Sequence, residues 1–168
     1  MKDKYTNKSI VAYHEAGHAV ITWALKVPLY HIDVGDFEGK VTGGTAPEYF
    51  FYDPDTMSDS DWIKIKNKAL ILLAGEEAER AFNELHELDC DEFLSGHDRS
   101  RLSDLLMKFG ESSCPPLDID MSTKTLEKQA SDLVANHWNQ IEVLAKELMI
   151  KGSMHGDEAK RIIESTEL

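Results

Sequence analysis

Apolar residues recur at helical spacing in three long stretches of the chain. Residues 10–25 are apolar on most sides, which predicts a buried helix. Residues 61–83 and 122–151 carry apolar positions three and four apart, which predicts two long helices that each turn one face to the core. Shorter helices are predicted over residues 98–109 and after Asp157, a residue suited to cap a helix. Helices therefore make up most of the predicted structure.

The stretch between the first two long helices has the alternation of a strand. Residues 29–34 alternate apolar and polar side chains, and Gly35-Asp36 follows as a predicted turn. A second short strand is expected at Val41-Thr42, before Gly43-Gly44. Asp59 or Ser60 is expected to cap the helix that comes next. The pattern predicts a mainly α fold with a small β element (α+β).

The sequence His14-Glu15-Ala16-Gly17-His18 lies inside the first predicted helix. Residues four apart share one face of a helix, so His14 and His18 can bind one zinc ion. Glu15 then lies beside the metal, where it can take a proton from a water whose pKa zinc lowers to roughly 7. The alternative is a pair of core histidines bonded to backbone, with Glu15 at a solvent edge. The apolar surroundings favour the metal site, because burying these side chains is costly unless they are paired or metal-bound.

A third zinc ligand is expected from a later helix. Glu79 is a candidate and Glu76 a less favoured one, although a solvated acidic face accounts well for Glu76 and Glu77. Asp98 stands at the start of another helix, where Asp is favoured for capping alone but could also face the zinc helix. Gly17 costs the helix on the order of 1 kcal/mol relative to Ala. Its missing side chain leaves room for another segment, or the metal site, to approach closely.

Composition and charge narrow the partners of the protein. The formal net charge is −13, from 31 acidic and 18 basic residues, and no basic stripe is present. This argues against nucleic acid and against an anionic membrane surface. The longest apolar run is residues 69–75, which is too short to cross a membrane, and the charged start lacks the apolar core of a signal peptide. Cys90 and Cys114 are not a CxxC pair, so free thiols and a cytoplasmic location are expected.

Several separated segments together resemble the peptidase domain of FtsH-type ATP-dependent zinc metalloproteases. Residues 12–20 are similar to that family's pattern around its zinc helix, and residues 72–79 are similar to its second helix. Ser95-Gly96 followed by Asp98 and Arg101 resembles the segment that carries the family's third ligand, although the spacing from Gly96 to Asp98 is shorter than usual. Residues 126–148 and 156–158 resemble the closing helices.

The resemblance implies that His14, His18 and Asp98 bind zinc and that Glu15 is the general base. It places Glu79 next to the site, where it would steady a ligand histidine. Glu79 and Asp104 remain rival third ligands.

A chain of 168 residues is expected to be one domain, or one with a small appendage, and the resemblance implies that residues 1–168 form a single zinc-peptidase-like helical domain. The metal-site region would span residues 8–110, and the C-terminal helices would lie within residues 122–168. The family's ATPase module and membrane anchors are absent from the sequence, so we expect a stand-alone domain.

The expected activity is that of a zinc metalloendopeptidase, which hydrolyses flexible or unfolded polypeptides without ATP. Gly39-Lys40 lacks the glycine spacing of a phosphate loop, which excludes a nucleotide site there. Residues 39–46 form a candidate edge strand that could pair with a substrate through the main chain, with Val41, Thr42, Gly43 and Gly44 as candidate substrate-binding residues. The alternative for this stretch is a flexible turn without a substrate role.

Two other functions stay open at this point. One is a metal-binding regulatory or interaction module with little turnover, although the presence of Glu15 argues against it, since zinc binding alone does not need that base. The other is a dedicated HExxH protease that cleaves a single regulator. The sequence leaves open the physiological substrate, the oligomeric state and whether an ATPase partner acts in trans.

Overall fold

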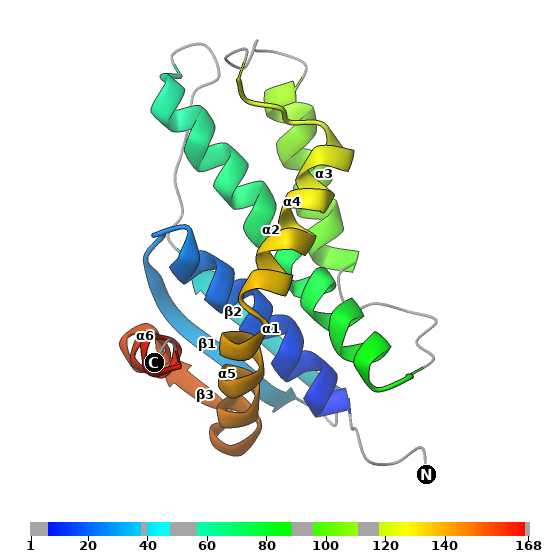
Figure 1. Cartoon of the computed structure of the whole chain (residues 1–168), viewed down its shortest axis with the longest axis vertical. Helices are drawn as coiled ribbons and strands as arrows, with labels where there is room; N and C mark the ends of the chain where they lie inside the picture. Colours follow the sequence, from blue (N-terminus) through cyan, green and yellow to red (C-terminus); the bar gives the residue numbers. More distant parts are fainter. Residues whose placement is uncertain (1–6, 38–39, 48–56, 89–95, 111–117, 167–168) are drawn as a thin grey trace.

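The structure is a computed structural model that describes residues 7–37, 40–47, 57–88, 96–110 and 118–166 (Figure 1). Within these ranges the chain forms six helices and a three-stranded sheet, which confirms the mainly α fold with a small β element. The elements follow in the order α1 (Asn7–Ala24), β1 (Leu29–Phe37), β2 (Lys40–Pro47), α2 (Asp59–Leu85), α3 (Gly96–Gly110), α4 (Thr123–Asn136), α5 (Trp138–Lys151), β3 (Ser153–His155) and α6 (Gly156–Ser165).

Helix α1 lies at the centre of the fold and is buried on nearly all sides, as its apolar sequence predicts. It contacts α2, α5, β1 and β2 (Figure 1). Gly17 lies at the crossing with α2, where an added Cβ would be 2.6 Å from both the Ala74 carbonyl oxygen and the Ala78 Cβ. The two helices can therefore approach this closely only because position 17 has no side chain.

Helix α2 connects two hydrophobic clusters. The half that contains Ala74, Ala78 and Phe82 packs with α1, the sheet, α5 and α6. The half that contains Trp62, Ile65 and Leu73 packs with α3 and α4 instead. The predicted cap at Asp59 or Ser60 is wrong. The N-cap is Ser58, whose hydroxyl accepts a hydrogen bond from the Asp61 backbone N–H while the Asp61 carboxylate accepts one from the Ser58 backbone N–H.

The long C-terminal helix that the sequence predicts is divided into α4 and α5 at His137, whose backbone leaves the helical region at φ −111° and ψ 18°. The break separates two packing partners. Leu126 and Ala130 of α4 belong to the cluster with α2 and α3, whereas Ile141 and Leu144 of α5 pack against α1. Gly152 ends α5 as predicted, with a φ of 80° that favours glycine.

Strand β1 is the middle strand of an antiparallel sheet with the order β2-β1-β3. The predicted turn at Gly35-Asp36 is wrong, because both residues continue β1 and pair with Thr42 and Val41. Strand β3 was not predicted from its three residues; Met154 pairs with Ile32 and is buried. The predicted cap at Asp157 is also wrong. Helix α6 begins at Gly156 with His155 as the N-cap, and Asp157 lies in the first turn of that helix.

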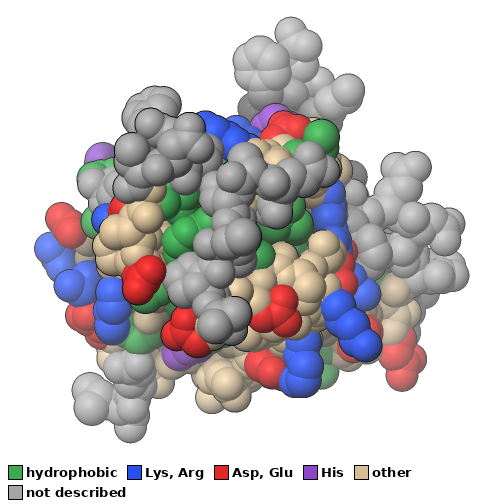
Figure 2. All heavy atoms as spheres, turned by 90° about the horizontal axis from the view of Figure 1, so that it is seen from above, with side chains coloured by type: hydrophobic (Ala, Val, Ile, Leu, Met, Phe, Trp, Pro, Cys, Tyr) green, Lys and Arg blue, Asp and Glu red, His purple; other side chains and the backbone are tan. Residues whose placement is uncertain are grey.

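Charged side chains of both signs surround a group of hydrophobic side chains on the end of the molecule shown in Figure 2. Among the residues that the structure describes, no helix is long and apolar enough to span a bilayer.

Candidate metal centre

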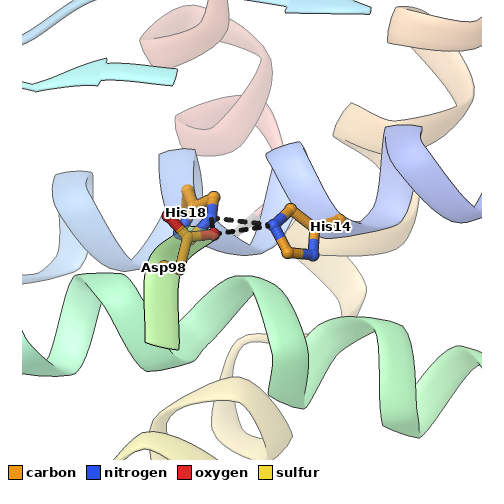
Figure 3. Close-up of side chains that lie close together, drawn as sticks. All are labelled: His14, His18 and Asp98. Atoms are coloured by element: carbon orange, nitrogen blue, oxygen red, sulfur yellow. Dashed lines mark hydrogen bonds and ion pairs between the residues drawn. The ribbon is translucent and has the colours of Figure 1, made fainter. Parts of the chain in front are cut away.

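Three polar side chains converge between α1 and the start of α3 (Figure 3). Asp98 Oδ2 lies 3.1 Å from His14 Nε2 and 3.1 Å from His18 Nε2, and the two Nε2 atoms are 3.1 Å apart. The three atoms therefore form an equilateral triangle. A tetrahedral zinc ion with bonds of about 2.0–2.1 Å spaces its ligand atoms by about 3.3 Å, so the triangle fits such an ion closely.

The two imidazoles are held so that both Nε2 atoms face this triangle. His18 Nδ1 lies 2.7 Å from the Ile71 carbonyl oxygen, which can only accept, so Nδ1 carries the proton. His14 Nδ1 lies 3.3 Å from Glu79 Oε2 and donates to that carboxylate in the same way. The lone pairs of both Nε2 atoms are then free for a metal, which is how outer contacts orient histidine ligands in metal sites.

The charges around the triangle favour a bound cation. Burial alone would lower the pKa of His14, but hydrogen bonds to Asp98 and Glu79 and the nearby Glu15 raise that pKa to about 9. Burial alone would raise the pKa of Asp98, but the contacts of its carboxylate with the His14 and His18 rings hold that pKa well below its usual range. A positive charge is thus stabilised at the position where the three side chains meet, and this charge can be a proton or a metal ion.

Helix α2 leaves space for the group at Gly75. A Cβ added to Gly75 would overlap His18 Nε2 and lie 2.7 Å from His14 Nε2. The sequence analysis did not single out this glycine as part of the site. The sequence feature that could have identified it is a helix-weakening glycine in the middle of a stretch of α2 that is otherwise rich in Ala and Leu.

Asp98 reaches the histidines from the first turn of α3, which begins at Gly96. The next residue, Arg99, donates to Glu76 on α2 at 2.6 Å and 2.7 Å and to Glu127 on α4 at 2.7 Å. Glu76 also accepts from Arg80 at 2.8 Å and is buried. The interpretation of Glu76 as part of a solvated face is therefore wrong, and Arg99 is a residue that the sequence analysis missed.

The other candidate residues take different positions. Glu15 is buried on α1 directly after His14. Glu79 contacts Nδ1 of His14 and not the triangle, so the structure places it as an orienting partner rather than among the three converging atoms. Asp104 is exposed on α3. The metal-ligating group found among the described residues contains neither rival.

Val41, Thr42, Gly43 and Gly44 lie within β2 and pair with β1 through residues 33–36. Strand β2 is at one edge of the sheet and its backbone lies against α1, the helix that carries His14 and His18. The structure thus agrees with the expectation of an edge strand over this stretch. Cys90 and Cys114 fall outside the described residues.

No protein-family model fits the chain, and no curated protein matches it. The functional argument therefore rests on the sequence segments and on the geometry of the metal centre.

Proposed function

We propose that the protein is a zinc-dependent endopeptidase of the kind that its resemblance to FtsH-type peptidase domains implies. The observation that supports this most directly is the triangle of His14, His18 and Asp98 with Glu15 next to the first ligand. A buried His–His–Asp group alone would support metal binding. The buried carboxylate that follows His14 on α1 adds a candidate proton acceptor, which metal binding by itself does not require.

His14 Nε2, His18 Nε2 and Asp98 Oδ2 would hold the ion. When bound, zinc supplies a Lewis acid that lowers the pKa of a water and polarises a substrate carbonyl. The carboxylate of Glu15 would accept the proton from the attacking water and pass it to the departing amine. Glu79 and the Ile71 carbonyl would keep the two rings oriented during this transfer, since each holds an Nδ1–H.

The proposed substrate is a flexible or unfolded polypeptide. Strand β2 offers an edge next to α1, and no strand covers its outer side among the described residues. An extended peptide can pair with such an edge through main-chain hydrogen bonds, and Gly43 and Gly44 would let its backbone come close. A chain that is already unfolded needs no unfolding step, so we expect its cleavage without ATP. An ATPase partner in trans would be needed only for folded substrates.

The test uses one disulfide-bonded protein in two forms, native and fully reduced and alkylated, so that the two substrates have nearly the same sequence and differ mainly in folding. We expect the zinc-loaded protein to cleave the unfolded form, to leave the native form intact, and to lose activity with a chelator. The matched variant is Glu15→Gln, which should retain zinc and lose about 10²–10⁴-fold in rate.

Each other outcome contradicts a named part of the proposal. Equal cleavage of both forms would refute the preference for unfolded chains. Glu15→Gln activity within a few-fold of wild type would rule out the general-base role. No cleavage of either form at full zinc occupancy would favour the binding or regulatory module, and cleavage of a single regulator alone would favour a dedicated protease.

A further inference from the structure

The first turn of α3 carries Asp98 but contributes little to the hydrophobic clusters. The first α3 side chain in the cluster with α2 and α4 is Leu102. Before it, His97 is exposed, and a Cβ added to Gly96 would meet no atom of the described residues within 4 Å. Apolar packing of α3 therefore begins one turn after the zinc ligand. Among the described residues, the contacts that hold the turn itself are polar.

Arg99 provides the contacts with α2 and α4. Its Nε and Nη2 atoms donate to the two oxygens of Glu76 at 2.6 Å and 2.7 Å, and its Nη1 donates to Glu127 at 2.7 Å. A guanidinium bound in this forked way fixes direction as well as distance. Glu76 follows Gly75 on α2, so the same turn of α2 both makes space for the histidines and anchors the helix that brings Asp98 to them.

We infer that Arg99 is a positioning residue of the metal centre, which holds Asp98 Oδ2 over the two Nε2 atoms by joining the first turn of α3 to α2 and α4. The inference rests on the proposed zinc site. Arg99 is cationic and its guanidinium donates to Glu76 and Glu127, so it is not a ligand itself. It acts through Asp98, its neighbour in the chain.

A second arginine on the same carboxylate separates this role from general stability. Arg80 donates to Glu76 at 2.8 Å, but Arg80 and Glu76 both belong to α2. Loss of Arg80 therefore removes a salt bridge from Glu76 without releasing α3. Loss of Arg99 releases only the first turn of α3, which carries Asp98, and leaves Glu76 paired with Arg80. Each variant removes one positive charge. Only the loss of Arg99 removes the connection between α2 and the turn that carries Asp98.

The experiment compares wild type, Arg99→Gln, Arg80→Gln and Arg99→Lys. Each protein is stripped of metal and titrated with Zn²⁺ against a chromogenic chelator, and with Co²⁺ to record the visible absorption of a tetrahedral site. Circular dichroism and thermal unfolding of the metal-free proteins check the fold. We expect Arg99→Gln to bind zinc about 10–100-fold more weakly, as is typical when an outer contact of a metal ligand is lost.

Arg80→Gln should bind zinc within about twofold of wild type, since the tie between α3 and α2 remains. Arg99→Lys keeps the charge but lacks the fork, so its affinity should fall between wild type and Arg99→Gln. The Co²⁺ absorption of Arg99→Gln should weaken at saturation because Asp98 is misplaced. These changes should appear with helical content unchanged.

Equal zinc affinity in Arg99→Gln and wild type would overturn the role of Arg99 and leave the zinc site intact. Equal losses in Arg99→Gln and Arg80→Gln would also overturn it, because the effect would then belong to Glu76 or to stability. Failure of the wild-type protein to bind either metal would overturn the proposed function and this inference together.

Discussion

Gly75 on α2 lies directly against the imidazole of His18 on α1. A Cβ at position 75 would overlap His18 Nε2, the atom that faces Asp98 Oδ2 at 3.1 Å. The Nδ1 of the same ring is held at 2.7 Å by the carbonyl of Ile71, one turn earlier on α2. Helix α2 thus holds Nδ1 of the ring with a hydrogen bond, and Gly75 places no side chain against Nε2. The histidine has little room to move away from a larger neighbour.

Gly75→Ala is expected to weaken zinc binding by at least about tenfold, the size seen when outer contacts of metal ligands are disturbed. The new methyl group must displace Nε2 of His18, His14 or both. Ala is otherwise the better helix former by about 1 kcal/mol, so helical content should stay the same. Zinc affinity and circular dichroism measured on the same samples check both statements.

The control for this variant is Gly96→Ala. A Cβ at Gly96 would meet no atom within 4 Å in the part of the chain that the structure describes, so zinc affinity should remain at the wild-type value. If Gly75→Ala bound zinc with wild-type affinity, the site would have space for a methyl group at position 75. The close packing of α2 against the two histidines would then be wrong.

The three acids near the site should rank in a fixed order when each is changed to Ala. Asp98→Ala removes an atom of the triangle and should cause the largest fall in zinc occupancy. Glu79→Ala removes only the contact to His14 Nδ1, so a loss of about 10–100-fold in affinity is expected. Asp104→Ala changes an exposed residue and should have no effect. Metal content after dialysis against limiting zinc measures all three.

A reversed order would contradict the assignment. Retention of zinc by Asp98→Ala together with loss from Glu79→Ala would make Glu79 the third ligand, and a loss from Asp104→Ala would point to a different arrangement of α3.

The sequence was sufficient to predict features that depend on spacing within one helix. His14 and His18 share a face because four residues make about one turn, and the apolar residues around them predicted a buried α1. The sequence also predicted the close approach at Gly17, because a glycine lowers helix stability but leaves space for a neighbouring segment. The sequence narrowed the third ligand to a few acids, among them Glu79 and Asp98, and the structure brings Asp98 to the two histidines.

Features that depend on pairing between distant segments could not be predicted in the same way. Arg99 and Glu76 are 23 residues apart, and nothing in the local pattern distinguishes them from exposed charges. The three residues of β3 form a strand only because β1 lies beside them. The break at His137 could not be predicted because the apolar spacing on both sides of it fits one continuous helix.

The stability of the metal-free protein should depend on pH through His14. Its pKa rises from 6.5 to about 9 on folding, since the hydrogen bonds to Asp98 and Glu79 outweigh the effect of burial. Between these pH values the folded chain binds more protons than the unfolded chain, so the free energy of unfolding must fall as pH rises. The contribution is complete below pH 6.5 and lost as pH rises through about 9, and it amounts to at most about 3 kcal/mol.

Urea unfolding of the metal-free protein at several pH values between 6 and 10 measures this change. His14→Gln removes the titrating group while other ionisable groups remain, so the difference between the two pH profiles isolates His14. With zinc bound, the ion takes the place of the proton at Nε2, and this fall in stability should disappear. A metal-free wild-type profile parallel to that of His14→Gln would show that His14 has no raised pKa, and Asp98 and Glu79 would then not stabilise a positive charge on its ring.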